Sequence, residues 1–481
     1  MGSLLEYTLT NEDRSLILTE LLVFSLFILA AYLMVKVTSY FNIENEQQRK
    51  IAVLSIPPAK LMFVLFLFFI FNAVFSLYSD DGFSILYLML SLVLSLSVIR
   101  TSFSLATFIA MLILRPWEIR PDLEILEIIP RVSFILFLFS YLMEALQKGR
   151  LNLKKNPIQV FYLILGFWVY MSTFVSSDIL QSQVSFFEGY MKSLIIAFAI
   201  FQGLENHDDY EVVTDSLLIS ALGVSAIAIL NTNMLVNTSR LEGKGALENA
   251  NDLAALLILV LPFSIKGFLH KRITFFNVFI SVLTIGLLFV GVWKAQSRAA
   301  YIAIGAMGAG YFGYHFRHNK KILRVGVLVC LIGAVVLSQL NLGRSSDDLQ
   351  DSKMNRLGYW KAGISMAIRN PVFGVGLDQF PKNYGMYGAA NFSEGGDRTA
   401  HSSWILILSE TGFPGLFFLL IIYLLAINRG WLLADRIPEL LLCLLGYGVT
   451  MSFLSHSYVL YPYLLTALCF AYPQDIKGDD S

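Results

Sequence analysis

The stretch ILRVGVLVCLIGAVVLSQLN, residues 322–341, is followed directly by LGRSSDDLQDSKMNRLGYWKAGISMAIRNP, residues 342–371. The first is an apolar run long enough to cross a bilayer whose hydrocarbon core is about 30 Å thick. The second opens a polar insertion that continues to residue 400, where the next apolar run begins. A chain of membrane helices seldom keeps so long a loop unless the loop acts at the bilayer surface. This boundary therefore predicts a membrane protein with a functional outer loop.

Apolar runs of the same kind recur along the whole chain. Hydrophobic residues make up 56% of the 481 residues and charged residues only 15%, with a mean hydropathy of +0.65, which excludes an ordinary soluble globule. We expect an all-α, polytopic integral membrane protein with about 12–15 transmembrane helices. The candidate spans are 16–36, 59–78, 83–99, 103–115, 130–146, 158–175, 185–203, 215–231, 250–269, 275–293, 299–315, 322–341, 402–427, 438–455 and 457–472. The first is expected to stay as a helix and not to be cleaved as a signal.

The placement of charge predicts how the chain sits in the membrane. Lys plus Arg and Asp plus Glu are both 35, so net charge gives no sign of a nucleic-acid partner. Basic links at 147–155, 266–272 and 315–321, with Arg429 and Arg436, all fall on one side if the spans are counted as above. The positive-inside rule makes that side cytoplasmic, so the long loop faces away from the cytoplasm.

The outer loop divides the chain into three parts: a bundle over 1–341, the loop over 342–400, and C-terminal helices over 401–481. Within the loop, the spacing of Leu357, Trp360, Ile364 and Ala367 predicts an amphipathic helix that ends at Asn370-Pro371 and lies against the bundle or the headgroups. The acidic residues before it, Asp347, Asp348 and Asp351, are interpreted as a solvated turn and not as metal ligands. Cys330, Cys443 and Cys469 lie in apolar spans, so neither a disulfide nor a zinc site is expected.

Four outward-facing groups are candidates for function: Arg240, Arg298, Arg356 and His401. Guanidinium groups present paired donors to phosphate oxygens, and a histidine can take a proton from a hydroxyl near neutral pH. Together they predict a substrate whose reacting end bears phosphate. The alternative for each arginine is a structural role at a helix end, especially for Arg240, and His456 is expected to have no partner.

The chain resembles the O-antigen ligase-like membrane proteins, which include lipopolysaccharide O-antigen ligases, related polysaccharide polymerases and protein O-oligosaccharyltransferases. The resemblance covers about residues 250–425 and rests on four segments, with RPWE (115–118) as an added similarity. In order they are NANDLAALLILVLPF (249–263), SRAAYIAIGA (297–306), RLGYWKAGISMAIRNPVFGVGLDQFP (356–381) and AHSSWILILSETGFPGLFFLLIIY (400–423).

This resemblance implies an inverting, metal-independent glycosyltransferase of the GT-C type that needs no cofactor. Its donor would be a glycan on undecaprenyl diphosphate at the periplasmic face of the bacterial inner membrane. Arg298 and Arg356 would hold the diphosphate, and His401 would activate the acceptor or contact phosphate. Many members have asparagine after the histidine, whereas this chain has Ser402, which leaves the orienting partner of the histidine open.

The acceptor implied first is lipid A-core, as in an O-antigen ligase. A polymerase with a glycan acceptor and a transferase onto protein share the same donor and motifs. A transporter or flippase for lipid-linked glycan is the alternative from another class, although it favours ionisable groups near the bilayer midplane over groups gathered at one face.

Overall fold

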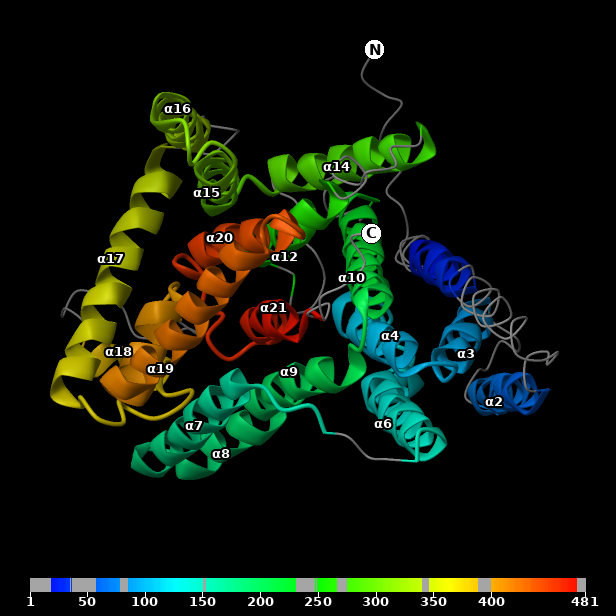
Figure 1. Cartoon of the computed structure of the whole chain (residues 1–481). Helices are drawn as coiled ribbons and strands as arrows, with labels where there is room; N and C mark the ends of the chain where they lie inside the picture. Colours follow the sequence, from blue (N-terminus) through cyan, green and yellow to red (C-terminus); the bar gives the residue numbers. More distant parts are fainter. Residues whose placement is uncertain are drawn as a thin grey trace, which may run out of the picture.

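The structure is a computed structural model that describes residues 19–34, 36, 58–77, 85–149, 153–230, 247, 249–265, 275–339, 346–387 and 399–473. Every regular element in these ranges is helical (Figure 1). In chain order they are the helix Thr19–Met34, α2 (Pro58–Leu77), α3 (Ile85–Ser97), α4 (Thr101–Leu114), α5 (Pro116–Ile119), η1 (Glu124–Ile128), α6 (Ile129–Gln147), α7 (Pro157–Ser172), η2 (Thr173–Val175), α8 (Ile179–Ser185), η3 (Phe186–Tyr190), α9 (Met191–Gly203), α10 (His207–Leu230), α12 (Ala250–Val260), η5 (Leu261–Ile265), α14 (Phe275–Ala295), α15 (Arg298–His315), α16 (Lys320–Gln339), α17 (Ser346–Arg369), α18 (Phe380–Tyr387), α19 (Ser403–Leu433), α20 (Pro438–Met451) and α21 (Leu460–Ala471).

Each predicted apolar run overlaps helical residues in the part of the chain that the structure describes. Within the described ranges, six helical stretches of 19 to 31 residues are long and apolar enough to cross a membrane, and seven further apolar segments have 10 to 17 residues. A helix satisfies all its backbone hydrogen bonds internally, which is what an apolar solvent demands. The expected fold class, an all-α polytopic membrane protein, is confirmed.

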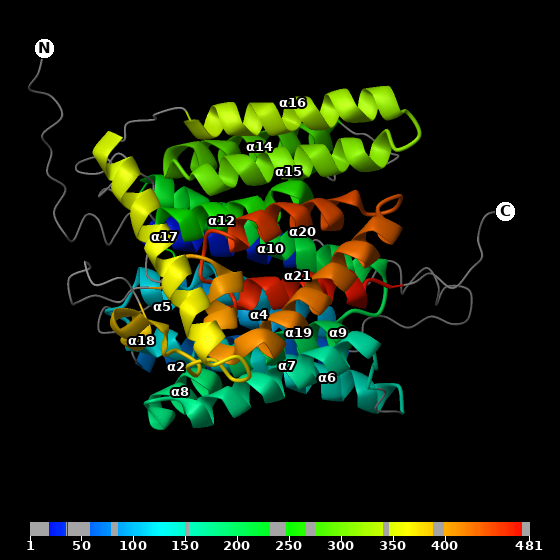
Figure 2. The same ribbon diagram turned by 90° about the vertical axis from the view of Figure 1, so that its left-hand side faces the viewer.

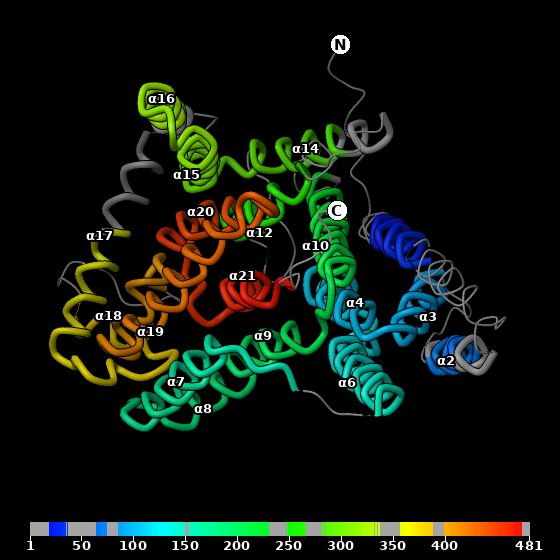
Figure 3. The backbone as a smooth tube through the Cα atoms, in the orientation of Figure 1, coloured from blue at the N-terminus to red at the C-terminus, as the bar shows by residue number. Residues whose placement is uncertain are grey.

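The centre of the bundle is α12. It packs against α10, α14, α15 and α20, and the backbone trace shows it in the middle of the molecule with α20 and α21 beside it (Figure 3). All of its residues from Leu253 to Val260 are buried, as expected for a helix that is apolar on every side. Only its first turn, with Asn251 and Asp252, is partly exposed.

The register of α15 against α20 fixes where Arg298 lies. Met307 packs over Gly446, and Leu445 over Gly310, so the two helices run antiparallel. At 1.5 Å per residue, Arg298 lies about 13 Å from Met307, and Phe453 lies about 10 Å beyond Gly446 in the same direction. Arg298 therefore lies at the end of the bundle where α20 stops.

α17 runs across the other helices at this same end and packs against α18 and α19 (Figure 2). Its last helical residue is Arg369, so the predicted stop at Asn370-Pro371 is confirmed. One detail of the prediction is wrong. The acidic stretch at 346–352 is helical and not a turn, because α17 begins at Ser346.

The buried face of α17 is set by its contacts with α18 and α19. Ala362 and Met366 pack into a small core with Phe380 and Tyr384 of α18, whereas Leu357 and Ile364 are about half exposed. Of the four residues predicted to share a packing face, Ala367 is the one that is fully buried. The small side chains face the bundle because α17 approaches α19 closely: Ile405 of α19 lies against Gly363.

Candidate functional site

The start of α19 and the segment after α20 are held together by hydrogen bonds. The His401 amide donates to Ser455 Oγ (3.0 Å), and the His456 amide donates to Ser403 Oγ (2.9 Å). Ser403 Oγ in turn donates to the Leu454 carbonyl (2.7 Å), and Ser457 Oγ donates to the Ser403 carbonyl (2.6 Å). These bonds place two histidines on a rigid platform at the end of the bundle.

His401 stands at a break in the chain just before α19. Its φ of 46° is in the left-handed region, which is uncommon for a residue with a side chain and marks a constrained turn. The ring of Tyr359 from α17 lies 5.5 Å from the imidazole, centroid to centroid. Tyr359 and Ser455 thus orient His401 in a chain that has Ser402 at the next position.

Charge around His401 acts in both directions. Burial lowers the pKa of His401 below its ordinary value, the guanidinium of Arg356 lowers it further, and the carboxylate of Asp252 opposes both. The lowered pKa favours the neutral imidazole near pH 7, with a cation and an anion both within electrostatic range.

Arg356 reaches the same place from α17. Its guanidinium carbon lies 5.9 Å from the centre of the Phe453 ring, in the segment that follows α20. Arg356 also lies within electrostatic range of His401, which is in contact with Tyr359 of the same helix, so the structure brings these two candidate residues to one end of the bundle. Arg298 is half-buried at the first position of α15, and no hydrogen bond or ion pair engages its guanidinium among the residues that the structure describes.

The sequence-based interpretation of His456 is wrong, because His456 has two partners. Its Nε2 lies 2.9 Å from Asp252 Oδ1, and its Nδ1 lies 2.7 Å from the Tyr447 hydroxyl. His456 is buried, and the Asp252 side chain is 23% exposed. Because 204 positions separate Asp252 from His456, no local pattern joins them. The available signal was a carboxylate in the first turn of an otherwise apolar helix.

Arg115 is a further cation that the sequence reasoning left aside. It occupies a left-handed position, φ 51°, between α4 and α5, and pairs with Glu118 at 2.9 Å. Tyr461, at the start of α21, lies within electrostatic range of Arg115 and of Asp252. The RPWE segment therefore belongs to the same end of the molecule.

The glycines of GVGLDQF allow the loop to pack against the backbone of α19. Gly374 and Gly376 take φ values of 63° and 98°, and the amides of Val375 and Gly376 donate to the carbonyls of Ser409 and Glu410 (2.9 and 3.1 Å). α19 breaks there, at Gly412 (φ 72°), and the Phe413 amide donates to the Pro371 carbonyl (2.9 Å). The loop is thus clamped into the break of α19.

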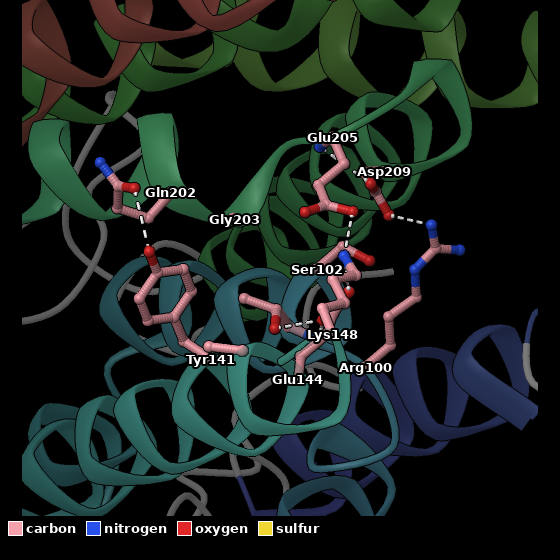
Figure 4. Close-up of a pocket in the computed structure, with 11 residues that line it drawn as sticks. Arg100, Ser102, Tyr141, Glu144, Lys148, Gln202, Gly203, Glu205 and Asp209 are labelled. Atoms are coloured by element: carbon pink, nitrogen blue, oxygen red, sulfur yellow. Dashed lines mark hydrogen bonds and ion pairs between the residues drawn. The ribbon is translucent and has the colours of Figure 1, made fainter. Parts of the chain in front are cut away.

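A polar pocket of about 270 Å³ lies elsewhere, between α4, α6, α9 and α10 (Figure 4). Its cations are already paired: Arg100 with Asp209 (3.0 Å), and Lys148 with Glu144 and Glu205 (2.8 and 2.5 Å). The pocket is at the first residues of α4, whereas Arg115 follows its last, about 20 Å away. It therefore lies at the opposite end of α4 from Arg115.

Two sets of predicted residues lie wholly or partly outside the described part of the chain. Arg240 falls in 231–246, so its role stays a prediction. Asp347, Asp348 and Asp351 are placed in α17 by their backbone alone.

The fold and these contacts define a polytopic α-helical membrane protein with arginine and histidine side chains gathered at one end of its bundle. Residues 283–420 match a protein-family model described as O-antigen ligase, and the match spans Arg298, Arg356 and His401. Over this segment, which is less than a third of the chain, the sequence is similar to the O-antigen ligase-like family. No curated protein matches the chain.

Proposed function

We propose that the protein is a membrane glycosyltransferase that moves a glycan from undecaprenyl diphosphate to an acceptor hydroxyl at the periplasmic face of the bacterial inner membrane. The most favoured acceptor is lipid A-core, as in an O-antigen ligase. The observation that carries the proposal is the meeting of Arg356 and His401, at the end of the bundle where Arg298 also lies, within the O-antigen ligase match.

The chemistry requires such a site. The acceptor oxygen attacks the anomeric carbon from the face opposite the diphosphate, the bond from carbon to phosphate oxygen breaks, and the configuration inverts. Negative charge grows on the departing diphosphate, where fixed guanidinium groups stabilise it best. Two arginines would provide the charge that a divalent metal supplies elsewhere, so we propose a metal-independent reaction without a cofactor.

In this proposal, each of the three parts of the chain has a role in the reaction. The bundle over 1–341 would hold the lipid, the loop over 342–400 would bring Arg356 over Arg298, and 401–481 would complete the site. Arg240 would add a third cation from the loop before α12. The enzyme needs no nucleic-acid partner; its partners would be the lipid-linked donor, the acceptor and membrane lipids.

The direct test supplies the purified protein with a lipid-diphosphate glycan and one acceptor at a time. Transfer to lipid A-core establishes a ligase, and chain growth without lipid A-core establishes a polymerase. Transfer to a protein establishes an oligosaccharyltransferase. Movement of the donor across a vesicle membrane, with no product from any acceptor, would instead establish a transporter.

A further inference from the structure

Asp252 presents a carboxylate with one oxygen fixed and the other open. Its Oδ1 lies 2.9 Å from His456 Nε2, and no other hydrogen bond of this carboxylate occurs among the residues that the structure describes. The side chain is 23% exposed, in contrast with the buried residues that follow it in α12. The Asp252 side chain is therefore partly open to the surface at this end of the bundle.

The proton positions behind Asp252 follow from the donors and acceptors available. A carboxylate only accepts, so His456 Nε2 carries a proton and donates it to Oδ1. If the imidazole is neutral, Nδ1 has a lone pair, and the fully buried Tyr447 hydroxyl donates to it across 2.7 Å. Each polar group in the chain Tyr447, His456, Asp252 is then satisfied without a buried cation.

The relay is also held in place. The His456 backbone is tied to Ser403, and Ser403 is tied to the residues on either side of His456. The imidazole itself is held by its contacts with Tyr447 and Asp252, and the same backbone bonds connect it to the start of α19, two residues after His401. Preorganisation of this kind is what a catalytic group requires.

Resting on the proposed glycosyl transfer, we infer that Asp252 is the catalytic base. Its Oδ2 takes the proton of the acceptor hydroxyl while the acceptor oxygen bonds to the anomeric carbon. The bond from that carbon to the diphosphate oxygen breaks, and its electron pair leaves with the diphosphate. Asp252 ends as a neutral acid, which returns its proton to water after the product departs.

In this assignment, one group takes the proton of the acceptor and other groups stabilise the leaving diphosphate. A proton taken by His401 would create a second cation against Arg356 before the phosphate charge has fully developed. A proton taken by Asp252 instead neutralises its carboxylate. Arg298 and Arg356 then remain the two cations that face the diphosphate. His401 then serves the leaving group, beside Arg356, and His456 acts as a positioning residue.

An acceptor that is already an anion can show whether Asp252 acts as a base or in some other role. Azide attacks carbon without losing a proton, so it needs no base. We expect D252N to lose hydroxyl transfer by about 100-fold or more and to form glycosyl azide at least about tenfold faster than it glycosylates the hydroxyl. H401Q should lose both reactions together. Y447F should slow hydroxyl transfer by less than D252N and leave azide transfer unchanged.

The asparagine keeps the shape of Asp252 and can still accept from His456, so size-exclusion profiles and donor binding by D252N should match those of the wild type. The assignment is overturned if D252N keeps hydroxyl transfer, if azide does not restore turnover in D252N, or if H401Q shows the azide rescue instead. A wild-type protein that glycosylates no hydroxyl acceptor would defeat the proposed function itself.

Discussion

A guanidinium near a half-buried imidazole sets the character of the site. Arg356 lies over an aromatic ring, which limits its freedom without removing its charge, and Arg298 stands at the first turn of α15. Planar paired donors suit phosphate oxygens better than the point charge of a lysine. The identity of these side chains should therefore matter beyond their charge.

We expect Arg298→Ala and Arg356→Ala to abolish transfer, and the two lysine variants to keep less than about a tenth of it, because lysine cannot make the bidentate contact. Initial rates with lipid-linked donor provide the measurement, with membrane abundance determined in parallel. Arg317→Ala is the matched control, since Arg317 lies past the opposite end of α15 and pairs with Asp435. Wild-type rates in either alanine variant would contradict the assignment.

The pKa of His401 should respond in opposite directions to its two charged neighbours. Arg356→Gln removes a cause of the lowering and should raise this pKa; Asp252→Asn removes the opposing cause and should lower it further. Nuclear magnetic resonance titration of labelled histidine measures both, with the His401 signal assigned by its loss in His401→Gln. Since the fold binds this proton more weakly than the unfolded chain, acidification through the histidine range should lower the free energy of unfolding. Shifts of equal sign would refute this electrostatic account.

At the scale of one residue, functional side chains that stand in a local motif could be predicted from the sequence. Side chains that become neighbours only in the folded protein could not. Arg356 stands in a motif of the outer loop and His401 in the motif that directly follows it, so their chemistry could be predicted from the sequence. Asp252 acquires its meaning from His456, which arrives through the C-terminal helices. Such a partner is visible only once α12 and α20 are packed.

At the scale of elements, the loop after α17 and the break in α19 depend on each other. The break leaves carbonyls of α19 without helical partners, and the backbone of residues 375–376 supplies donors to them. In return, the loop gains a fixed path from α17 to α18. The polar insertion is thus attached to the bundle by backbone hydrogen bonds as well as by side-chain packing.

Gly412→Ala should release this attachment. A β-carbon there would lie 2.5 Å from the carbonyl oxygens of Pro371 and Val372, and the φ of 72° adds strain of about 1–3 kcal/mol. Thermal unfolding in detergent should begin at lower temperature, and limited proteolysis should cut the loop sooner. Gly385→Ala is the control, because no atom lies within 4 Å of a β-carbon at that position of α18. Equal behaviour of the two variants would exclude the clamp.

Element positions were predictable because apolar runs of membrane length have one stable backbone arrangement in lipid. The sequence did not show which face of α17 is buried. The helix has apolar residues on two faces, and the larger side chains dominate the periodic pattern. Packing selected Ala362 and Met366 because α19 approaches closely, and left Leu357 and Ile364 outward. Small residues at a helix contact carry little hydrophobic signal in sequence.

At the scale of the whole molecule, charged and polar side chains gather at the two ends of the helix bundle. The end with α17 and α18 holds Arg356, His401 and Asp252, which have charges of both signs next to a partly exposed surface. The other end holds the ion pairs around Arg100 and Lys148 and the turn with Arg317. The positive-inside rule assigns the second end to the cytoplasm, so the first should face the periplasm.

Single cysteines at the two ends test that orientation. Lys382 of α18 and Arg317 after α15 are similarly exposed, with side-chain fractions of 43% and 39%, which makes Lys382→Cys and Arg317→Cys a matched pair. The native Cys330, Cys443 and Cys469 would first be replaced by serine or alanine. In intact spheroplasts, a membrane-impermeant maleimide should label the cysteine at 382, and it should label that at 317 only after lysis. Both variants should react equally in detergent, which shows that each thiol is accessible. Labelling of 317 before lysis, with 382 protected, would place the arginines and histidines at the cytoplasmic face, where a periplasmic glycosyl transfer could not occur.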